Sequence, residues 1–194
     1  DLFSASFNHD GTRVVTASWD KTAKIWDAKT GEVLLTLEGH TGWAKSASFS
    51  PNGRQVVTAS QHSPAIIWDA TTGERVCTFE SVCTYGGRCF HNTASFSPDG
   101  TRVLTTTQRY GKAQIWDAST GALVHILDTT SRYQLTSASF SRDGHQVVVG
   151  SREGHIEIWD VTAGERTCTL DRAHIDRVES VSFSLDGTQF ITAG

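Results

Sequence analysis

The sequence predicts an all-β fold built from repeated units of four short antiparallel strands, and three observations lead to this prediction. A phrase that ends in a turn occurs five times, as ASFNHDG at 5–11, ASFSPNG at 47–53, ASFSPDG at 94–100, ASFSRDG at 138–144 and VSFSLDG at 181–187. A Trp-Asp pair occurs in AKIWDA at 23–28, AIIWDA at 65–70, AQIWDA at 113–118 and IEIWDV at 156–161. Helical periodicity is almost absent. Both phrases repeat about every 43 residues, which indicates an array of similar structural units.

Each unit divides into four strands joined by turns. The SASF stretch alternates small polar with apolar residues, as a half-buried strand does, and the SPDG variants that follow have the residues of a tight turn. A β-rich run such as RVVTAS at 13–18 comes next, then the IWD strand, then a turn with Gly and a fourth strand such as EVLLTL at 32–37. We therefore expect one domain over 1–194, with units at 1–37, 44–79, 90–127 and 134–170 and a partial unit at 174–194.

Composition limits the classes of partner. The net charge is −4, from 17 basic and 21 acidic residues, which argues against an electrostatic nucleic-acid binder. No apolar run approaches the length of a membrane span, so we expect no membrane partner. No signal or transit peptide pattern is visible, and we expect a cytoplasmic protein.

The four cysteines do not have the spacing of a zinc site, and we expect no metal and no cofactor. Cys77 and Cys168 fall at equivalent places in the repeat and are predicted to be ordinary strand residues. Cys83 and Cys89 lie in a local insertion with His91 nearby. A disulfide or metal site there is the less favoured alternative to ordinary loop residues.

The GH, SPDG and IWD phrases at this period resemble the WD40 β-propeller family, and ASFSPDGTRV and DKTAKIWDA resemble bacterial WD40 arrays in particular. The resemblance covers nearly the whole chain. It implies four-stranded blades set radially around a central channel. Four complete blades plus half a blade would make an incomplete ring. We therefore expect part of a longer array, or association with another copy or chain through open strand edges.

The resemblance also implies a hydrogen-bonded tetrad in each blade, made by a His, a Ser or Thr, a turn Asp and the Trp of the third strand. An indole N–H that is buried needs such an acceptor. No blade has a full set: His62 stands at the Asp position of the second blade, Arg109 or Tyr110 at that of the third, and the fourth has Ser131, Val149 and Glu153. The matching residues are Thr16, Asp20 and Trp26; His40, Thr58 and Trp68; Thr105 and Trp116; Trp159; and His174 and Thr192.

Reading these residues as a catalytic triad is disfavoured, because they are repeated, incomplete and adjacent to a core Trp. No Gly-rich phosphate loop, zincin helix or G-x-S-x-G elbow is present, so we expect no enzyme activity. The Asp of each Trp-Asp pair is expected to end the third strand and shape the following turn.

A protein-binding face is expected where the turns after the second strand and before the first strand gather. Aromatic and Arg residues dominate protein-binding hot spots. The candidates are Trp19, Gln61, Arg109 and Arg152 after the second strand, and Trp43, Phe90, Gln134 and Arg177 before the first. Packing of Trp43 and Phe90 against a neighbouring blade is an equally good explanation, and the insertion at 81–90 is either a contact loop or drift.

The sequence thus predicts a non-enzymatic scaffold that binds proteins or peptides. The alternative is the regulatory propeller portion of a larger bacterial signalling enzyme, fused to a kinase, protease-like or NTPase domain.

Overall fold

A computed structural model of the chain describes residues 1–80, 91–107, 111–131, 134–184 and 186–194. Within these ranges every regular element is a strand, and the strands form four four-stranded antiparallel sheets and one two-stranded sheet. The predicted fold class, an all-β incomplete propeller, is confirmed. None of the described elements is a helix capable of crossing a bilayer.

Each sheet is one blade, and its strands follow the order of the chain. The first blade contains β1 (Leu2–Phe7), β2 (Arg13–Ser18), β3 (Ala23–Asp27) and β4 (Val33–Leu37). The second contains β5 (Ala44–Phe49), β6 (Gln55–Ser60), β7 (Ala65–Asp69) and β8 (Arg75–Phe79). The third contains β9 (His91–Phe96), β10 (Arg102–Thr107), β11 (Lys112–Asp117) and β12 (Leu123–Asp128). The fourth contains β13 (Leu135–Phe140), β14 (Gln146–Ser151), β15 (Ile156–Asp160) and β16 (Arg166–Leu170), and the half blade contains β17 (Ser180–Phe183) and β18 (Phe190–Ala193).

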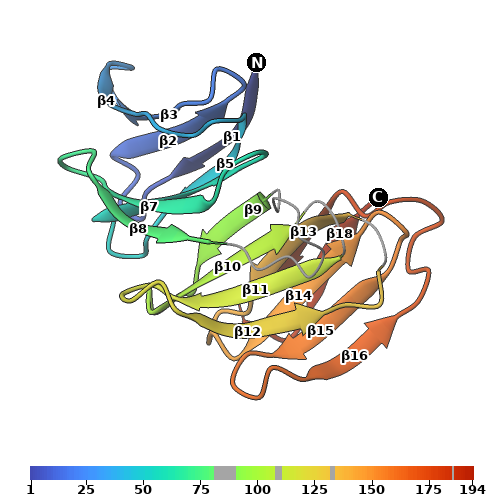
Figure 1. Cartoon of the computed structure of the whole chain (residues 1–194). Helices are drawn as coiled ribbons and strands as arrows, with labels where there is room; N and C mark the ends of the chain where they lie inside the picture. The colour runs from blue at the N-terminus through green and yellow to red at the C-terminus, as the bar shows by residue number, and fades with distance from the viewer. Residues whose placement is uncertain (81–90, 108–110, 132–133, 185) are drawn as a thin grey trace.

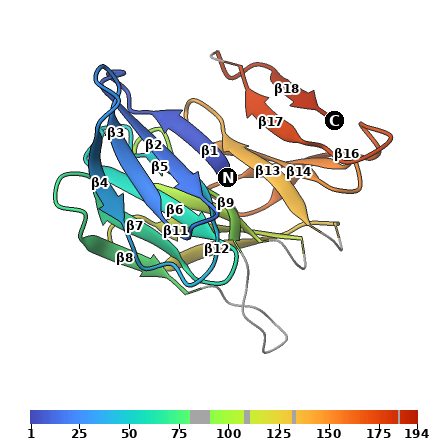
Figure 2. The ribbon, with the colours of Figure 1, turned by 90° about the horizontal axis from the view of Figure 1, so that it is seen from above.

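The blades follow one another along an arc, with the blue first blade and the red half blade at its two ends (Figures 1 and 2). The first strands of successive blades lie next to each other, from β1 through β5, β9 and β13 to β17. The apolar core lies between blades. Trp68 of the second blade, for example, packs in one cluster with Val15 and Ile25 of the first. Each blade therefore depends on its neighbour to bury its apolar face.

Serine side chains link neighbouring blades along the first strands. The backbone N–H of Ala47 donates to Ser4 Oγ at 3.0 Å, and that of Ala94 donates to Ser46 Oγ at 2.9 Å. The Ala-Ser alternation of the SASF phrase thus provides a small side chain for close packing and a hydroxyl that accepts a bond from the next blade. The Ser137 hydroxyl accepts from Val181 N–H at 3.3 Å in the same way.

The boundary between the third and fourth blades is bonded differently. At the position of Ser4 the third blade has Thr93, whose hydroxyl lies 2.8 Å from Thr106 Oγ1 within its own sheet. Asn92 takes over the contact, and its Nδ2 donates to the carbonyls of Leu135 and Thr136 at 3.1 and 3.2 Å.

Turn chemistry fixes the ends of the strands as the sequence predicts. Gly100 closes the SPDG turn with a left-handed φ of 74°, which a residue with a side chain adopts only with strain. The Asp of the Trp-Asp pair shapes the following turn, because Asp69 Oδ1 accepts from the backbone N–H groups of Thr71 and Thr72 at 2.7 and 2.8 Å. In the third blade, bonds from Ser119 and Thr120 lower the pKa of Asp117 to about 2. The predicted role of this Asp is confirmed.

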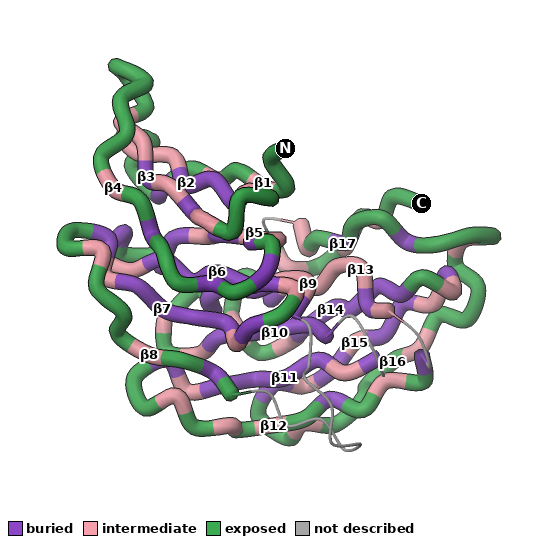
Figure 3. Tube along the Cα trace, turned by 45° about the horizontal axis from the view of Figure 1, so that its top comes forward, coloured by how far each residue is buried: buried purple, intermediate pink, exposed green. Residues whose placement is uncertain are grey.

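Both ends of the arc expose apolar residues that the interior of the array buries. Phe7 is 67% exposed, whereas the equivalent Phe49, Phe96 and Phe140 are at most 9% exposed. In the half blade Ile191 is 73% exposed, while its equivalents Val57, Leu104 and Val148 are at most 1% exposed. The half blade ends at the edge of β18, which pairs with no further strand of the described residues, and the first blade exposes one face of its sheet (Figure 3). Association through these open ends stays a prediction.

Candidate functional site

A β-bulge in the first strand of the blades sets one residue apart from the regular pairing. In β1, Leu2 pairs with Ser18 and Ser4 with Ala17, so Phe3 has no partner across the ladder. The same shift occurs in β5 and β13 and leaves Lys45 and Thr136 without one. In the third blade the residue between the shifted pairs is Asn92. A bulge bends the strand and redirects the side chain of its extra residue. The side chain at each of these positions can therefore point in a direction that the regular alternation of the strand does not give.

Phe3 and Lys45, from the first two of these bulges, meet Trp19 and Trp43 at the boundary between the first and second blades. The Trp43 ring stacks on Phe3 with centroids 6.3 Å apart, and Trp19 meets Trp43 edge-on at 5.4 Å. Lys45 Nζ lies 3.7 Å from the centre of the Phe3 ring and 5.2 Å from that of Trp43. We call these four residues the aromatic patch. The exposed fractions of Phe3, Trp19 and Trp43 are 41%, 50% and 36%, so the patch is open to a partner.

The sequence singled out Trp19 and Trp43 but missed Phe3 and Lys45, the two bulge residues. A signal for them was present, because they lie directly before the recurring serine phrase at a position where the five repeats have Phe, Lys, Asn, Thr and Glu. Such variation beside a constant phrase indicates that the fold does not require one residue type at this position. In the third and fourth blades the bulge residues are used internally. Asn92 bonds to the next blade, as described above, and Thr136 Oγ1 donates to the Gly150 carbonyl at 3.1 Å.

The other residues predicted for the binding face lie at equivalent places in different blades. The N–H of Gln61 donates to the Trp43 carbonyl, and the N–H of Arg152 donates to the Gln134 carbonyl, both at 3.0 Å. The N–H of Trp19 donates to the Asp1 carbonyl at the corresponding place. Arg177 belongs to the segment before the half blade and forms an ion pair with Glu179. The structure thus brings Trp19 and Trp43 into contact and leaves Arg152, Gln134 and Arg177 at other blades, while Phe90, Arg109 and the insertion at 81–90 lie outside the described residues.

The second blade contains a buried network of four side chains, one of which is its Trp. Trp68 Nε1 donates to Thr58 Oγ1 at 2.8 Å, and His40 Nε2 is hydrogen-bonded to the same hydroxyl at 2.6 Å. The other ring nitrogen of His40 is bonded to Ser63 Oγ at 2.6 Å. Burial, with a smaller contribution from the charge of Arg75, lowers the pKa of His40 to about 4. Ser63 thus stands where the family tetrad has Asp, whereas the exposed His62 at the predicted position is not in this set of bonds.

The other blades retain parts of this network. Trp26 Nε1 donates to Thr16 Oγ1 at 2.8 Å, and Trp116 Nε1 donates to Thr105 Oγ1 at 2.9 Å. His174 Nε2 is hydrogen-bonded to Thr192 Oγ1 at 2.8 Å. Asp20, which the sequence assigns to the same set as Trp26, bonds instead within its own turn, where its carboxylate accepts from Thr22.

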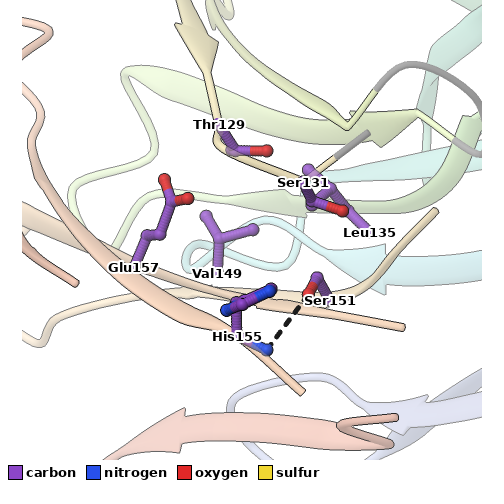
Figure 4. A pocket seen from close by; sticks show the side chains of 7 residues that line it. All are labelled: Thr129, Ser131, Leu135, Val149, Ser151, His155 and Glu157. Atoms are coloured by element: carbon purple, nitrogen blue, oxygen red, sulfur yellow. Dashed lines mark hydrogen bonds between the residues drawn. The ribbon is translucent and has the colours of Figure 1, made fainter. Parts of the chain in front are cut away.

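In the fourth blade the indole N–H of the Trp donates to a carboxylate, which the sequence-based prediction missed. Trp159 Nε1 donates to Glu157 Oε2 at 3.1 Å, and the N–H of Thr130 donates to Glu157 Oε1 at 2.7 Å. Glu157 is only 3% exposed, and Arg166 Nη1 lies 3.5 Å from its Oε1. In place of His40 this blade has Ser131, which lines a hollow together with Val149, His155 and Glu157 (Figure 4). The hollow is too tight to hold a ligand.

The model of the family described as WD domain, G-beta repeat (WD40) matches residues 1–27, 31–69 and 121–160, which together make up more than half of the chain. The chain belongs to the WD40 repeat family. The matched stretches include β1–β3, β4–β7 and β12–β15 of this WD40 array.

Among curated proteins, the WD40 array is similar to "Dynein assembly factor with WD repeat domains 1" of Xenopus laevis and Danio rerio, with 49% and 51% identity over 39 residues. This stretch is 20% of the chain and 9% of each relative. It is also similar to "Nuclear distribution protein PAC1" of Komagataella phaffii, with 43% identity over 35 residues, which is 18% of the chain and 7% of the relative. The chain therefore covers a small part of these relatives. All three are eukaryotic proteins, and the likeness to bacterial arrays stays a prediction.

The His, Thr and Ser of the network in the second blade are buried. Thr58 is fully buried and His40 is 6% exposed, so the hydroxyl that resembles a nucleophile is out of reach of a substrate. The described residues contain no group of three or more His, Cys, Asp or Glu that could hold a metal ion. Cys77 and Cys168 are free thiols in β8 and β16, as expected for strand residues, while Cys83 and Cys89 fall in the segment that the structure does not describe.

Proposed function

We propose that this WD40 array is a non-enzymatic scaffold for proteins or peptides and that the aromatic patch is its partner site. One observation carries the proposal: three large, partly exposed rings and a lysine meet at the boundary between the first and second blades. Monomeric proteins leave contiguous apolar surface of this kind exposed chiefly where they bind a partner. The rigid sheets beneath keep the ordering cost of binding low.

The relatives are consistent with this proposal at a coarse level. Their names describe an assembly factor and a nuclear distribution protein, and binding to other proteins is the property that such roles would share with a WD40 scaffold. The alternative, a propeller that regulates a fused bacterial kinase, protease-like or NTPase domain, rests on sequence resemblance alone. The cytoplasmic location also stays a prediction.

Peptide display tests the partner site directly. A random library is selected on the wild-type chain and counter-selected on the Trp19→Ala/Trp43→Ala variant, whose far-UV circular dichroism is checked against the wild type. We expect to recover peptides that bind the wild type but not the double Trp variant, because binding needs the two exposed rings. A matched variant at two exposed apolar residues outside the patch, Val33→Ala/Leu34→Ala, is expected to retain all of them. If every selected peptide also binds the double Trp variant, the aromatic patch is not the partner site.

A second proposal concerns self-association, which the exposed faces at the two ends of the arc favour. Inside the array, the face that contains Phe49 is covered by the preceding blade, and the face that contains Val57 is covered by the following blade. Phe7 and Ile191 occupy these two positions on uncovered faces. We propose that the half blade of one copy covers the first blade of another in a head-to-tail contact. The contact would repeat a mode of packing that this chain already uses between its own blades.

A further inference from the structure

Lys45 differs from several other cations of the chain because it has no acidic partner. Lys112, Arg166 and Arg177 each lie within 4 Å of a carboxylate. No carboxylate of the described residues lies at ion-pair distance from Lys45, and the segments outside those ranges contain no Asp or Glu. Its close neighbours are the rings of Phe3 and Trp43.

The surroundings of Lys45 make this lone charge receptive to an anion. The side chain is partly buried, and desolvation lowers the pKa of Lys45. The two rings stabilise the ammonium group through cation–π attraction, which holds it in place without neutralising it. A carboxylate brought to this point would form a charge-assisted hydrogen bond in a partly dehydrated setting, where such bonds are stronger than at the open surface.

We propose that the aromatic patch recognises a peptide segment in which an Asp or Glu lies next to a large apolar side chain. The carboxylate pairs with Lys45, and the apolar side chain packs on the exposed rings of Trp19 and Trp43. This inference rests on the proposed function, since it names the ligand of the same site.

Two other ligand classes fit the patch less well. A basic or methylated-lysine peptide would bring a second cation to the ring face that Lys45 Nζ already occupies at 3.7 Å. Single-stranded nucleic acid stacks on aromatic rings but also needs a basic groove along its backbone. The patch offers one lysine on a chain with a net charge of −4.

Fluorescence anisotropy with defined probes tests the inference on the whole 194-residue chain. The probes are a fluorescein-labelled acidic peptide, GSELEFESG, its basic counterpart GSKLKFKSG, its apolar-deleted counterpart GSEAEAESG, and an oligo-deoxythymidine. The acidic peptide is expected to bind at least about tenfold more tightly than the other three. Lys45→Met keeps the aliphatic stem and is expected to weaken binding of the acidic peptide about fivefold to tenfold. Lys45→Glu is expected to reverse the preference between the acidic and basic peptides, and the matched surface variant Lys29→Met is expected to change nothing.

The outcomes separate this inference from the proposed function. Equal binding of acidic and basic peptides, no effect of Lys45→Met, tighter binding of the oligonucleotide, or no binding of the acidic peptide up to about 1 mM would each overturn the inference. If display nevertheless yields peptides that depend on Trp19 and Trp43, the proposed partner site is supported and only the preference for acidic peptides is rejected. If display yields none, the proposed function itself falls.

Discussion

Val149 and Glu157 face each other across the β14–β15 ladder, at the place where other blades supply a Thr to their Trp. The corresponding pairs are Thr16 with Lys24, Thr58 with Ile66 and Thr105 with Gln114. In the fourth blade the acceptor for the indole N–H has therefore moved to the opposite strand of the same ladder pair. The larger carboxylate also reaches Thr130, in the connection from the third blade, so it ties two blades together.

Removing the charge of Glu157 should destabilise the fourth blade, and restoring the usual acceptor should recover part of the loss. We expect Glu157→Gln to lower the free energy of unfolding by about 2 kcal/mol, because a buried charge-assisted network is weakened. Val149→Thr/Glu157→Gln recreates the Thr105 and Gln114 pair of the third blade and should recover about 1 kcal/mol. Urea unfolding measures both, with Glu165→Gln on the same blade as an exposed control. A double variant no more stable than the single one would contradict the assigned role.

Two buried histidines should make the fold sensitive to mild acid. Burial lowers the pKa of both His40 and His91 to about 4, with smaller contributions from Arg75 and from His40 respectively. The unfolded chain takes up these protons near pH 6.5, so stability is full above that pH and declines as the pH falls toward 4. For His40 the loss is about 2 kcal/mol at pH 5.

Urea unfolding at neutral pH and at pH 5 measures this dependence. His40→Gln should unfold more easily at neutral pH, because its bonds to Thr58 and Ser63 are altered, but it should lose less stability on acidification than the wild type. His9→Gln, at an exposed position, should keep the wild-type dependence. If the free energy of unfolding of His40→Gln falls between neutral pH and pH 5 as much as that of the wild type, His40 is not one of the titrating groups.

The head-to-tail contact predicts a specific pattern of complementation. Phe7→Asp and Ile191→Asp each place a charge on one of the two uncovered faces, and each should abolish open-ended association in light scattering. Mixed together, the two variants still share one intact contact, formed by Ile191 of the first and Phe7 of the second, and should form a dimer. Ile175→Asp, at an exposed residue outside the two faces, should associate as the wild type does. A monomeric wild type, or a mixture that stays monomeric, would rule the contact out.

The tryptophans of the array should separate into two classes by their effect on stability. Trp68 is 1% exposed and donates to Thr58, so Trp68→Phe should cost about 1–3 kcal/mol through the lost bond and imperfect packing. Trp43 is 36% exposed, and Trp43→Ala should cost less than about 1 kcal/mol. Thermal unfolding followed by circular dichroism compares them. Similar losses in both variants would mean that Trp43 serves the packing of the blades, as the alternative reading of this residue holds.

The strands could be predicted from the sequence because the signals that set them are local. The Gly100 turn, the alternation of the serine phrase and the Asp that follows each Trp act within a few residues of one another. The missed residues depend on pairing. Glu157 becomes the Trp acceptor only because β15 lies across from β14, and Ser63 rather than His62 reaches His40 because of the path of one turn. Phe3 and Lys45 leave the regular alternation at a bulge, which a period of two residues does not reveal.

The change from the serine contacts of Ser4 and Ser46 at the first two blade boundaries to the Asn92 contact at the third has a consequence for how such arrays can be rearranged. A blade that carries a serine at this point reaches a backbone N–H of its successor, whereas the third blade reaches two carbonyls of its successor instead. Exchange of the third blade with another would therefore leave mismatched groups on both sides of the junction. The repeats are alike in sequence, but the contact made by Asn92 ties the third blade to its place before the fourth.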